Sequence, residues 1–213
     1  MTGKHIDWIF GAGLVAGASY FLGRDLPLSF ALLAAWKGAG VALFALWAAL
    51  QARSTDGKLI ALALACGALG DVLIEGNLIQ GALGFLAGHV VATMLYLRNR
   101  QGPLGWIIAV ALGVALIAFL LPAQRDQAPG VGFYALGLGT MAATAWLSRF
   151  PATTVKLGAL CFVASDLFLF SRMGPLHGSI LPDLTVWPLY LSGQALIAWG
   201  VVTSLRRPAF GGR

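Results

Sequence analysis

Residues 28–50 read LSFALLAAWKGAGVALFALWAAL, an apolar run in which Lys37 is the only charged side chain. An α-helix needs about 20 mostly apolar residues to cross a hydrocarbon core of about 30 Å, so this run is long enough to span a membrane. Similar runs fill the rest of the chain, separated by short stretches rich in charged residues, Gly and Pro, which are typical of loops. The sequence therefore predicts an all-α, polytopic transmembrane bundle of about eight helices, at residues 6–22, 28–50, 59–74, 78–97, 104–121, 131–147, 154–170 and 186–205.

The composition of the whole chain supports a membrane protein. Of its 213 residues, 59% are hydrophobic and 10% are charged, and the mean hydropathy is +0.83. A soluble domain carries about 25% charged residues, because its surface faces water. We therefore exclude an ordinary soluble domain and expect a single transmembrane domain, residues 1–213, in contact with the lipid bilayer. The net charge of +6 indicates membrane topology and not a nucleic-acid partner.

Basic residues alternate between the predicted loops. Ten of the fourteen lie on one side of the predicted bundle and three on the other, with Lys37 inside a span. Because cytoplasmic loops carry the excess of Lys and Arg, both termini are predicted to be cytoplasmic, which requires an even number of spans. We expect an integral protein of the bacterial inner (plasma) membrane. The ten are Lys4, Arg53, Lys58, Arg98, Arg100, Arg149, Lys156, Arg206, Arg207 and Arg213, and the three are Arg24, Arg125 and Arg172.

Glycine is frequent in the predicted spans, with 28 residues in the chain. Two pairs, Gly13/Gly17 and Gly84/Gly88, have the four-residue spacing that lets two membrane helices approach closely. We interpret both pairs as helix-packing contacts.

A short internal similarity relates two of the predicted spans. Cys66-Gly-Ala-Leu-Gly-Asp71 and Cys161-Phe-Val-Ala-Ser-Asp166 share a Cys and an Asp at an offset of 95 residues. The match is compatible with a parallel duplication of a four-helix unit. Neither cysteine belongs to a CxxC or Cys/His pattern, so the sequence predicts no metal cluster and no disulfide framework.

Ionisable side chains also occur inside the predicted spans. Each costs a few kcal/mol in lipid and is expected to face a cavity or another polar group. At 1.5 Å per residue, Asp71 lies about 6 Å and Asp166 about 9 Å from the loops on the side of Arg24 and Arg172. Convergence at this depth predicts a cavity that opens outward. The candidate residues are Lys37, Asp71, His89 and Asp166, with Glu75 one turn beyond Asp71 and with Tyr190 and Gln194, which share a helix face.

The same residues also have structural interpretations. Lys37 could form an ion pair with either aspartate, and His89 could be a hydrogen-bonded packing residue. Tyr190 and Gln194 could bridge neighbouring helices through hydrogen bonds.

Four motifs stand in order in the third, fourth, seventh and eighth predicted spans. They are Gly70-Asp71-x-Leu73, Phe85-x-x-x-His89, Gly158-Ala-Leu-Cys-Phe162-x-x-Ser165-Asp166 and Pro188-x-Tyr190-x-x-x-Gln194-x-Leu196-Ile197. Together with the eight-span layout, they resemble the YhhN-type lysoplasmalogenase family. The chain departs from the family pattern at Ala92, where an aromatic residue, usually Tyr, is expected one turn after the histidine; Tyr96 follows a turn later.

The resemblance implies hydrolysis of the vinyl-ether bond of lysoplasmalogens to a long-chain aldehyde and glycerophosphocholine or glycerophosphoethanolamine. The expected partner is thus a lysophospholipid substrate. A vinyl ether breaks by protonation at carbon, which gives an oxocarbenium ion that water captures; one acid and one carboxylate serve this chemistry, as in glycosidases. Asp71 and Asp166 match the acidic motif residues, and we expect them to be the catalytic pair, one of them kept ionised by Lys37. The expected supporting residues are Lys37, Glu75, His89, Ser165, Tyr190 and Gln194, with no metal and no cofactor.

Two other classes of function compete with this hypothesis. A proton-coupled transporter of small molecules or lipids would relay protons through buried Asp, Lys and His side chains, and transporters often contain internal repeats. However, the spans lack paired Gly and Pro interruptions, and Pro188 is the only proline well placed to break a helix. A purely structural protein gives no reason to keep buried ionisable residues. The hydrolase is the favoured hypothesis and the transporter the alternative.

Overall fold

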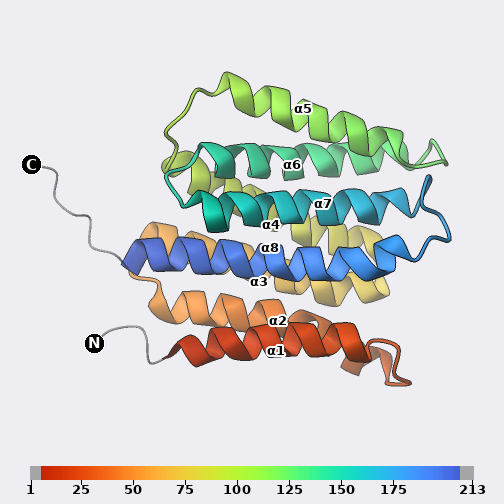
Figure 1. Cartoon of the computed structure of the whole chain (residues 1–213), viewed down its shortest axis with the longest axis horizontal. Helices are drawn as coiled ribbons and strands as arrows, with labels where there is room; N and C mark the ends of the chain where they lie inside the picture. The colour runs from red at the N-terminus through yellow and green to blue at the C-terminus, as the bar shows by residue number, and fades with distance from the viewer. Residues whose placement is uncertain (1–5, 207–213) are drawn as a thin grey trace, which may run out of the picture.

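The computed structural model of the chain describes residues 6–206, which form eight α-helices and no β-strand (Figure 1). Successive helices run in opposite directions along the long axis of the bundle. The prediction of an all-α bundle of eight helices is confirmed. The helices are α1 (Asp7–Gly23), α2 (Phe30–Gln51), α3 (Thr55–Gly76), α4 (Leu78–Arg98), α5 (Gly105–Leu120), α6 (Ala128–Leu147), α7 (Leu157–Ser171) and α8 (Leu181–Arg206), and a π-helical turn, η2 (Ala152–Lys156), leads directly into α7.

Three helices, α3, α6 and α8, begin three to five residues before the spans predicted from hydropathy. Ser54 caps α3, because its Oγ accepts a hydrogen bond of 3.1 Å from the backbone N of Gly57. Pro129 and Pro182 lie in the first turns of α6 and α8, where a helix tolerates the missing N–H. Polar residues and prolines that are typical of loops thus form the first turns of these helices.

Six helical segments within residues 6–206 are long and apolar enough to cross a membrane: α2, α3, α4, α6, α8 and the segment Ala152–Ser171 that joins η2 to α7. The other two helices are shorter, with 17 residues in α1 and 16 in α5. At 1.5 Å per residue they measure about 25 Å, slightly less than the hydrocarbon core. The chain is therefore an integral membrane protein.

The last helix, α8, joins both halves of the chain. It contacts α1, α2, α3 and α7, whereas α5 packs chiefly against α6 at the edge of the bundle (Figure 1). Several large side chains of α5, among them Ile108, Leu112 and Leu116, are exposed on its outer face. We infer that α5 faces lipid over most of its surface.

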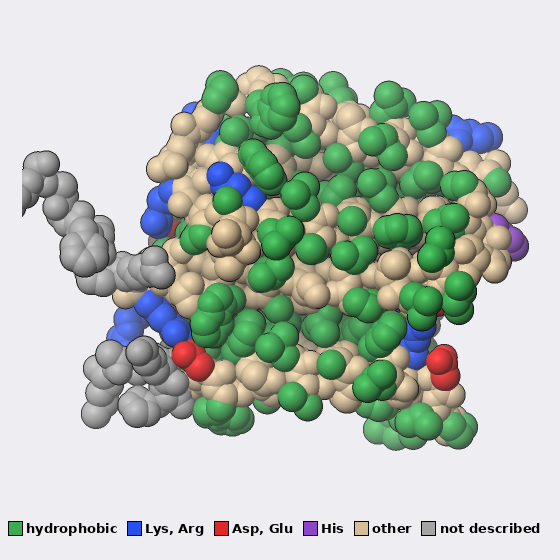
Figure 2. Space-filling model, viewed as in Figure 1, with side chains coloured by type: hydrophobic (Ala, Val, Ile, Leu, Met, Phe, Trp, Pro, Cys, Tyr) green, Lys and Arg blue, Asp and Glu red, His purple; other side chains and the backbone are tan. Residues whose placement is uncertain are grey.

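Charged side chains gather at the two ends of the bundle, and hydrophobic side chains cover the surface between them (Figure 2). At one end, here called the terminal end, Asp7 of α1 forms an ion pair with Arg206 of α8 and accepts a hydrogen bond of 2.9 Å from Trp47 Nε1. The described cations at the terminal end are Arg53, Lys58, Arg98, Arg100, Arg149, Lys156 and Arg206, those at the opposite end are Arg24, Arg125 and Arg172, and Lys4, Arg207 and Arg213 lie outside the described residues.

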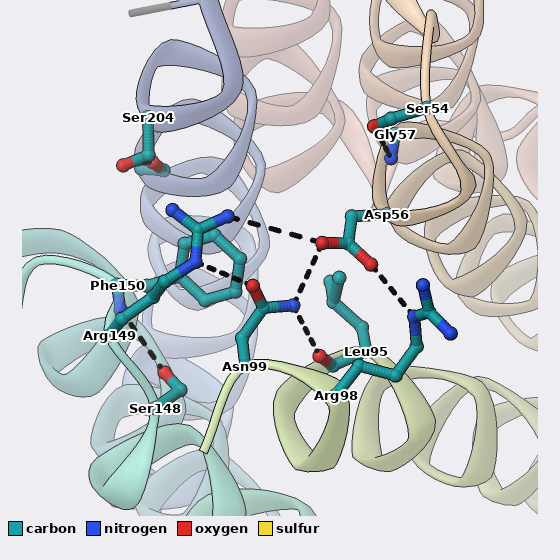
Figure 3. A network of polar contacts seen from close by, with 11 residues as sticks. Ser54, Asp56, Gly57, Leu95, Arg98, Asn99, Ser148, Arg149, Phe150 and Ser204 are labelled. Carbon is teal, nitrogen blue, oxygen red and sulfur yellow. Dashed lines mark hydrogen bonds and ion pairs between the residues drawn. The ribbon is translucent and has the colours of Figure 1, made fainter. Parts of the chain in front are cut away.

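A polar network centred on Asp56 joins three connections at the terminal end (Figure 3). Arg98 Nε and Asn99 Nδ2 donate to the two carboxylate oxygens of Asp56, each at 2.9 Å. Asn99 in turn accepts a hydrogen bond of 2.5 Å from Arg149 Nε, which follows α6. The start of α3, the end of α4 and the end of α6 are thereby fastened together.

The glycine pairs lie where helices approach closely. A Cβ atom placed on Gly40 of α2 would lie 3.1 Å from Gly17 Cα of α1, and one on Gly84 of α4 would lie 2.9 Å from Gly70 Cα of α3. Such distances leave no room for a side chain, so the backbones themselves form the contact. Both predicted pairs are helix-packing contacts.

We predict that Gly84→Ala destabilises the protein. The added methyl group would press against the α3 backbone beside Asp71 and force the two helices apart, at a cost of about 1–3 kcal/mol. The free energy of unfolding in mixed detergent micelles measures this loss. Gly113→Ala is the matched control, because nothing lies within 4 Å of a Cβ at that α5 position; equal losses in the two variants would contradict the packing argument.

Candidate functional site

A cavity of about 500 Å³ lies at the end of the bundle opposite the terminal end. Its wall is formed by every helix except α5. Charged residues of the α1–α2 and α7–α8 connections, Arg24, Asp25 and Arg172, stand at its mouth, whereas Asp71 and Asp166 lie deeper, one to two helical turns inside α3 and α7. The cavity thus leads from water to two carboxylates inside the membrane-spanning part.

Asp71, on α3, is 1% exposed and is held by a tyrosine of α8. Tyr190 donates its hydroxyl proton to Asp71 Oδ2 at 2.8 Å. Gln194, one turn further along α8, donates from Nε2 to the Tyr190 hydroxyl at 3.3 Å. The expected common face of Tyr190 and Gln194 therefore points at this carboxylate.

Asp166, on α7, has a similar arrangement built from other helices. It is 5% exposed, and the hydroxyl of Tyr134, on α6, donates to its Oδ2 at 2.9 Å. His89 Nε2, on α4, lies 3.1 Å from the same hydroxyl. Because a hydroxyl has one proton to donate, His89 Nε2 is the donor when Tyr134 donates to Asp166. With Asp166 protonated, the direction of both bonds can reverse, so Asp166, Tyr134 and His89 form a chain with two proton arrangements.

An aromatic side chain separates these two groups. The Phe162 ring lies 5.0 Å from the His89 ring and 5.2 Å from the Tyr190 ring, in edge-to-face geometry with both. Phe85 packs edge-on against Tyr190 from α4 at 5.7 Å. These rings fix the directions of the tyrosine and histidine side chains.

Lys37 pairs with Glu75 rather than with an aspartate. The Lys37 Nζ donates to Glu75 Oε1 at 2.6 Å, and its charge lies 6.0 Å from the ring centres of both Tyr20 and Trp187. The structural alternative in which Lys37 forms an ion pair with Asp71 or Asp166 is wrong, because its long side chain extends toward the mouth and meets the carboxylate one turn beyond Asp71. Both residues still line the cavity.

Ser165, beside Asp166, ties two helices together. Its Oγ donates to the backbone oxygen of Val186, on α8, at 2.9 Å. The acceptor lies two residues before Pro188, the proline inside α8. Ser165 therefore fixes the position of α7 against α8 at the depth of the cavity.

The structure brings the predicted site residues together in two layers. His89 and Gln194 lie behind Tyr134 and Tyr190. The other six line the cavity: Lys37, Asp71, Glu75, Ser165, Asp166 and Tyr190.

Tyr134 is a site residue that the sequence did not predict. The chain has four tyrosines in all, and three of them, Tyr20, Tyr134 and Tyr190, line the cavity.

Toward the terminal end the interior is filled by an apolar layer. Ile60, Leu64, Leu95 and Val201 are each at most 1% exposed. Tyr96 belongs to the same region: it packs against a phenylalanine at 6.1 Å, its hydroxyl has no hydrogen-bond partner among residues 6–206, and it does not line the cavity. A void of about 30 Å³ lies beside His89 and Gln194 and borders this layer at Ile60 and Leu64.

No group of three or more His, Cys, Asp or Glu side chains within residues 6–206 is arranged to hold a metal ion. Cys66 and Cys161 are both free thiols. The side chains that line the cavity offer carboxyl, hydroxyl, ammonium and guanidinium groups, and an amide and an imidazole lie behind them.

A comparison with protein families matches the part of the chain that contains the two buried aspartates. The model of the YhhN family matches residues 32–201. No curated protein and no solved structure matches the chain. The matched region contains each of the predicted site residues.

We predict that Lys37 and Glu75 stabilise the cavity wall as a pair. Lys37→Met leaves the Glu75 carboxylate without its cation, and Glu75→Gln leaves the ammonium without its anion. Since the side chains are 18% and 25% exposed, each replacement should cost between the ~1 kcal/mol of an exposed pair and the ~3 kcal/mol of a buried one.

The double variant Lys37→Met/Glu75→Gln closes a double-mutant cycle measured by unfolding in mixed micelles. It should lose less stability than the sum of the two single variants. Strict additivity would show that the two charges do not interact.

Proposed function

The chain belongs to the YhhN family, and from this premise we propose that it is a lysoplasmalogenase-like membrane hydrolase. It cleaves the vinyl-ether bond of a lysoplasmalogen to a fatty aldehyde and glycerophosphocholine or glycerophosphoethanolamine. One observation carries the proposal: two buried carboxylates, Asp71 and Asp166, each accept a tyrosine hydroxyl in the wall of the same cavity.

The reaction needs one proton donor and one carboxylate. A protonated carboxyl group delivers its proton to the β-carbon of the vinyl ether, and the resulting oxocarbenium ion is steadied by the other, ionised carboxylate. Water then attacks the cationic carbon and gives up a proton to a carboxylate, and the hemiacetal collapses to aldehyde and alcohol. The two roles follow the logic of paired carboxyl groups in glycosidases. No net proton is consumed.

The surrounding hydrogen bonds suit this proton traffic. Tyr190 and Tyr134 orient the carboxyl groups, and Gln194 and His89 orient the tyrosines. Because the Tyr134 hydroxyl can donate to either Asp166 or His89, it can pass a proton between them as the charge on Asp166 changes. Asp71 and Asp166 are the proposed catalytic residues, and the remaining polar groups support them.

The depth of the carboxyl groups suits a lysolipid. A lysolipid keeps its head group in water and its sn-1 linkage just below the interface. Asp71 lies five residues before the end of α3 and Asp166 five before the end of α7, about 7–8 Å below the mouth. We also propose that the mouth faces away from the cytoplasm of a bacterium, with both termini inside, because the terminal end carries the larger number of cations.

Proton-coupled transport, the alternative function, has less support. Buried apolar side chains of the apolar layer lie between the cavity and the terminal end. Within residues 6–206, α3, α4 and α8 are continuous helices, whereas many transporters bind their substrates at interrupted ones. A cavity open at one end serves a substrate that enters and leaves by the same route.

We predict that Asp71→Asn and Asp166→Asn each lower kcat by about 10²–10⁴-fold, because each removes a group that donates or accepts a proton. The assay is aldehyde release from a vinyl-ether lysolipid by the purified protein in detergent. Asp126→Asn, an exposed loop substitution, is the matched control. Folded wild-type protein that releases no aldehyde from choline or ethanolamine substrates would refute the proposed hydrolase.

We predict that Tyr134→Phe and Tyr190→Phe each lower kcat by about 10–100-fold, since each leaves a carboxyl group without a hydrogen bond worth about 1.5–3 kcal/mol. The Tyr134 variant should also change the pH profile of kcat, because it disconnects His89 from Asp166. Tyr96→Phe is the control, as that hydroxyl has no partner among the described residues. If Tyr134→Phe and Tyr190→Phe had the same kcat as Tyr96→Phe, a role of the two site hydroxyls in turnover would be excluded.

A further inference from the structure

Two arginines stand side by side at the mouth of the cavity. Arg24 follows α1 and Arg172 follows α7, and both contact Asp183 in the first turn of α8. Arg24 Nη2 donates to the backbone oxygen of Asp183 at 2.9 Å, and Arg172 Nη2 lies 2.8 Å from its Oδ1. All three residues line the cavity. One residue thus holds two guanidinium groups from different helices at the entrance.

The hydrogen-bonding capacity of these arginines is not filled. Arg172 Nε is buried and has no hydrogen-bond partner among residues 6–206, and a charged donor without an acceptor is costly when buried. Arg24 is positioned by the ring of Phe21, whose centre lies 4.9 Å from the guanidinium carbon. Guanidinium groups present several N–H donors in a fixed plane that matches the oxygens of a phosphate group. A phosphate oxygen at the mouth would supply the missing acceptor.

The other charges at the mouth determine what kind of phosphate fits. The Asp183 carboxylate neutralises one of the two arginines, and Lys37 is neutralised by Glu75. Asp25 lines the same mouth, is exposed, and forms no ion pair or hydrogen bond with another described side chain. One positive charge and one negative charge are therefore left over, which matches a ligand that carries one of each.

We infer that the mouth of the cavity binds the head group of a zwitterionic lysophospholipid, with Arg24 and Arg172 on the phosphodiester and Asp25 on the ammonium group. The inference rests on the proposed function and adds to it the residues that bind the head group. Arg172 lies six residues beyond Asp166, about 9 Å along the helix axis. When the phosphate is bound at the mouth, the glycerol unit extends along this distance, and the sn-1 ether lies toward the carboxyl groups.

The first test measures binding without turnover. Isothermal titration of glycerophosphoethanolamine into the detergent-solubilised full chain should give binding that weakens about tenfold in Arg24→Gln and in Arg172→Gln, as expected for the loss of a charged hydrogen bond. Arg125→Gln is the matched control: this arginine lies at the same end of the bundle but bonds to the backbone oxygens of Phe119 and Pro122 and does not line the cavity.

Two further probes test the choice of ligand. Asp25→Asn should weaken binding of glycerophosphoethanolamine and leave glycerophosphoglycerol, which has no ammonium group, unaffected. Inorganic phosphate should bind more weakly than glycerophosphoethanolamine to the wild type. Equal binding of the two would overturn the zwitterionic site in favour of a simple anion site, and so would an Arg125→Gln effect as large as that of Arg172→Gln.

The second test uses turnover to separate this inference from the proposed function. We compare kcat/KM for a vinyl-ether lysophosphatidylethanolamine and for an alkenylglycerol that lacks the phosphate group. The kcat/KM for the phosphorylated substrate, divided by that for the alkenylglycerol, should fall about tenfold in each arginine variant, because KM for the phosphorylated substrate rises. An unchanged ratio overturns the head-group site while the hydrolase stands. Arginine-dependent binding without any aldehyde release overturns the hydrolase while the head-group site stands.

Discussion

A polar group buried within a bilayer must find its hydrogen-bond partner inside the protein, and this constraint organises the whole bundle. Asp71 and Asp166 find their partners in Tyr190 and Tyr134, which in turn are held by Gln194 and His89. These six side chains come from α3, α4, α6, α7 and α8. The Asp71 group therefore links α3 to α8, the Asp166 group links α7 to α6 and α4, and the apolar residues of these helices pack around both groups.

Close backbone contacts make this arrangement possible. Gly70, next to Asp71, lies against Gly84, and Gly158 of α7 lies against Gly193 of α8, where a Cβ atom on either residue would come within 2.9 Å of the other residue's carbonyl oxygen. Backbones at such distances let short side chains reach across from one helix to the next. The α3–α4 contact lies next to Asp71, whereas Gly158 lies eight residues before Asp166, toward the terminal end.

Hydropathy predicted the eight helices well, because lipid imposes one length and one composition on every span. The cavity was also foreseen in outline, since ionisable residues such as Asp71 and Asp166 were expected to face a cavity or another polar group. Two features could not be predicted. Nothing in the residues around Tyr134 distinguishes it from an interfacial or packing tyrosine, because only its contact with Asp166, on another helix, gives it a role. The pairing of Lys37 with Glu75 was not foreseen, because counting residues locates Cα atoms and not the end of a long, flexible side chain.

The apolar layer between the cavity and the terminal end has a consequence for the cell that contains this protein. Ile60, Leu64, Leu95 and Val201 place buried apolar side chains between the carboxyl groups and the terminal end. Because apolar surroundings are costly for charged groups, these side chains oppose the passage of protons through this part of the bundle and favour exchange through the mouth. A protein can in this way carry acid–base chemistry inside an energised membrane without short-circuiting the ion gradient that the membrane maintains.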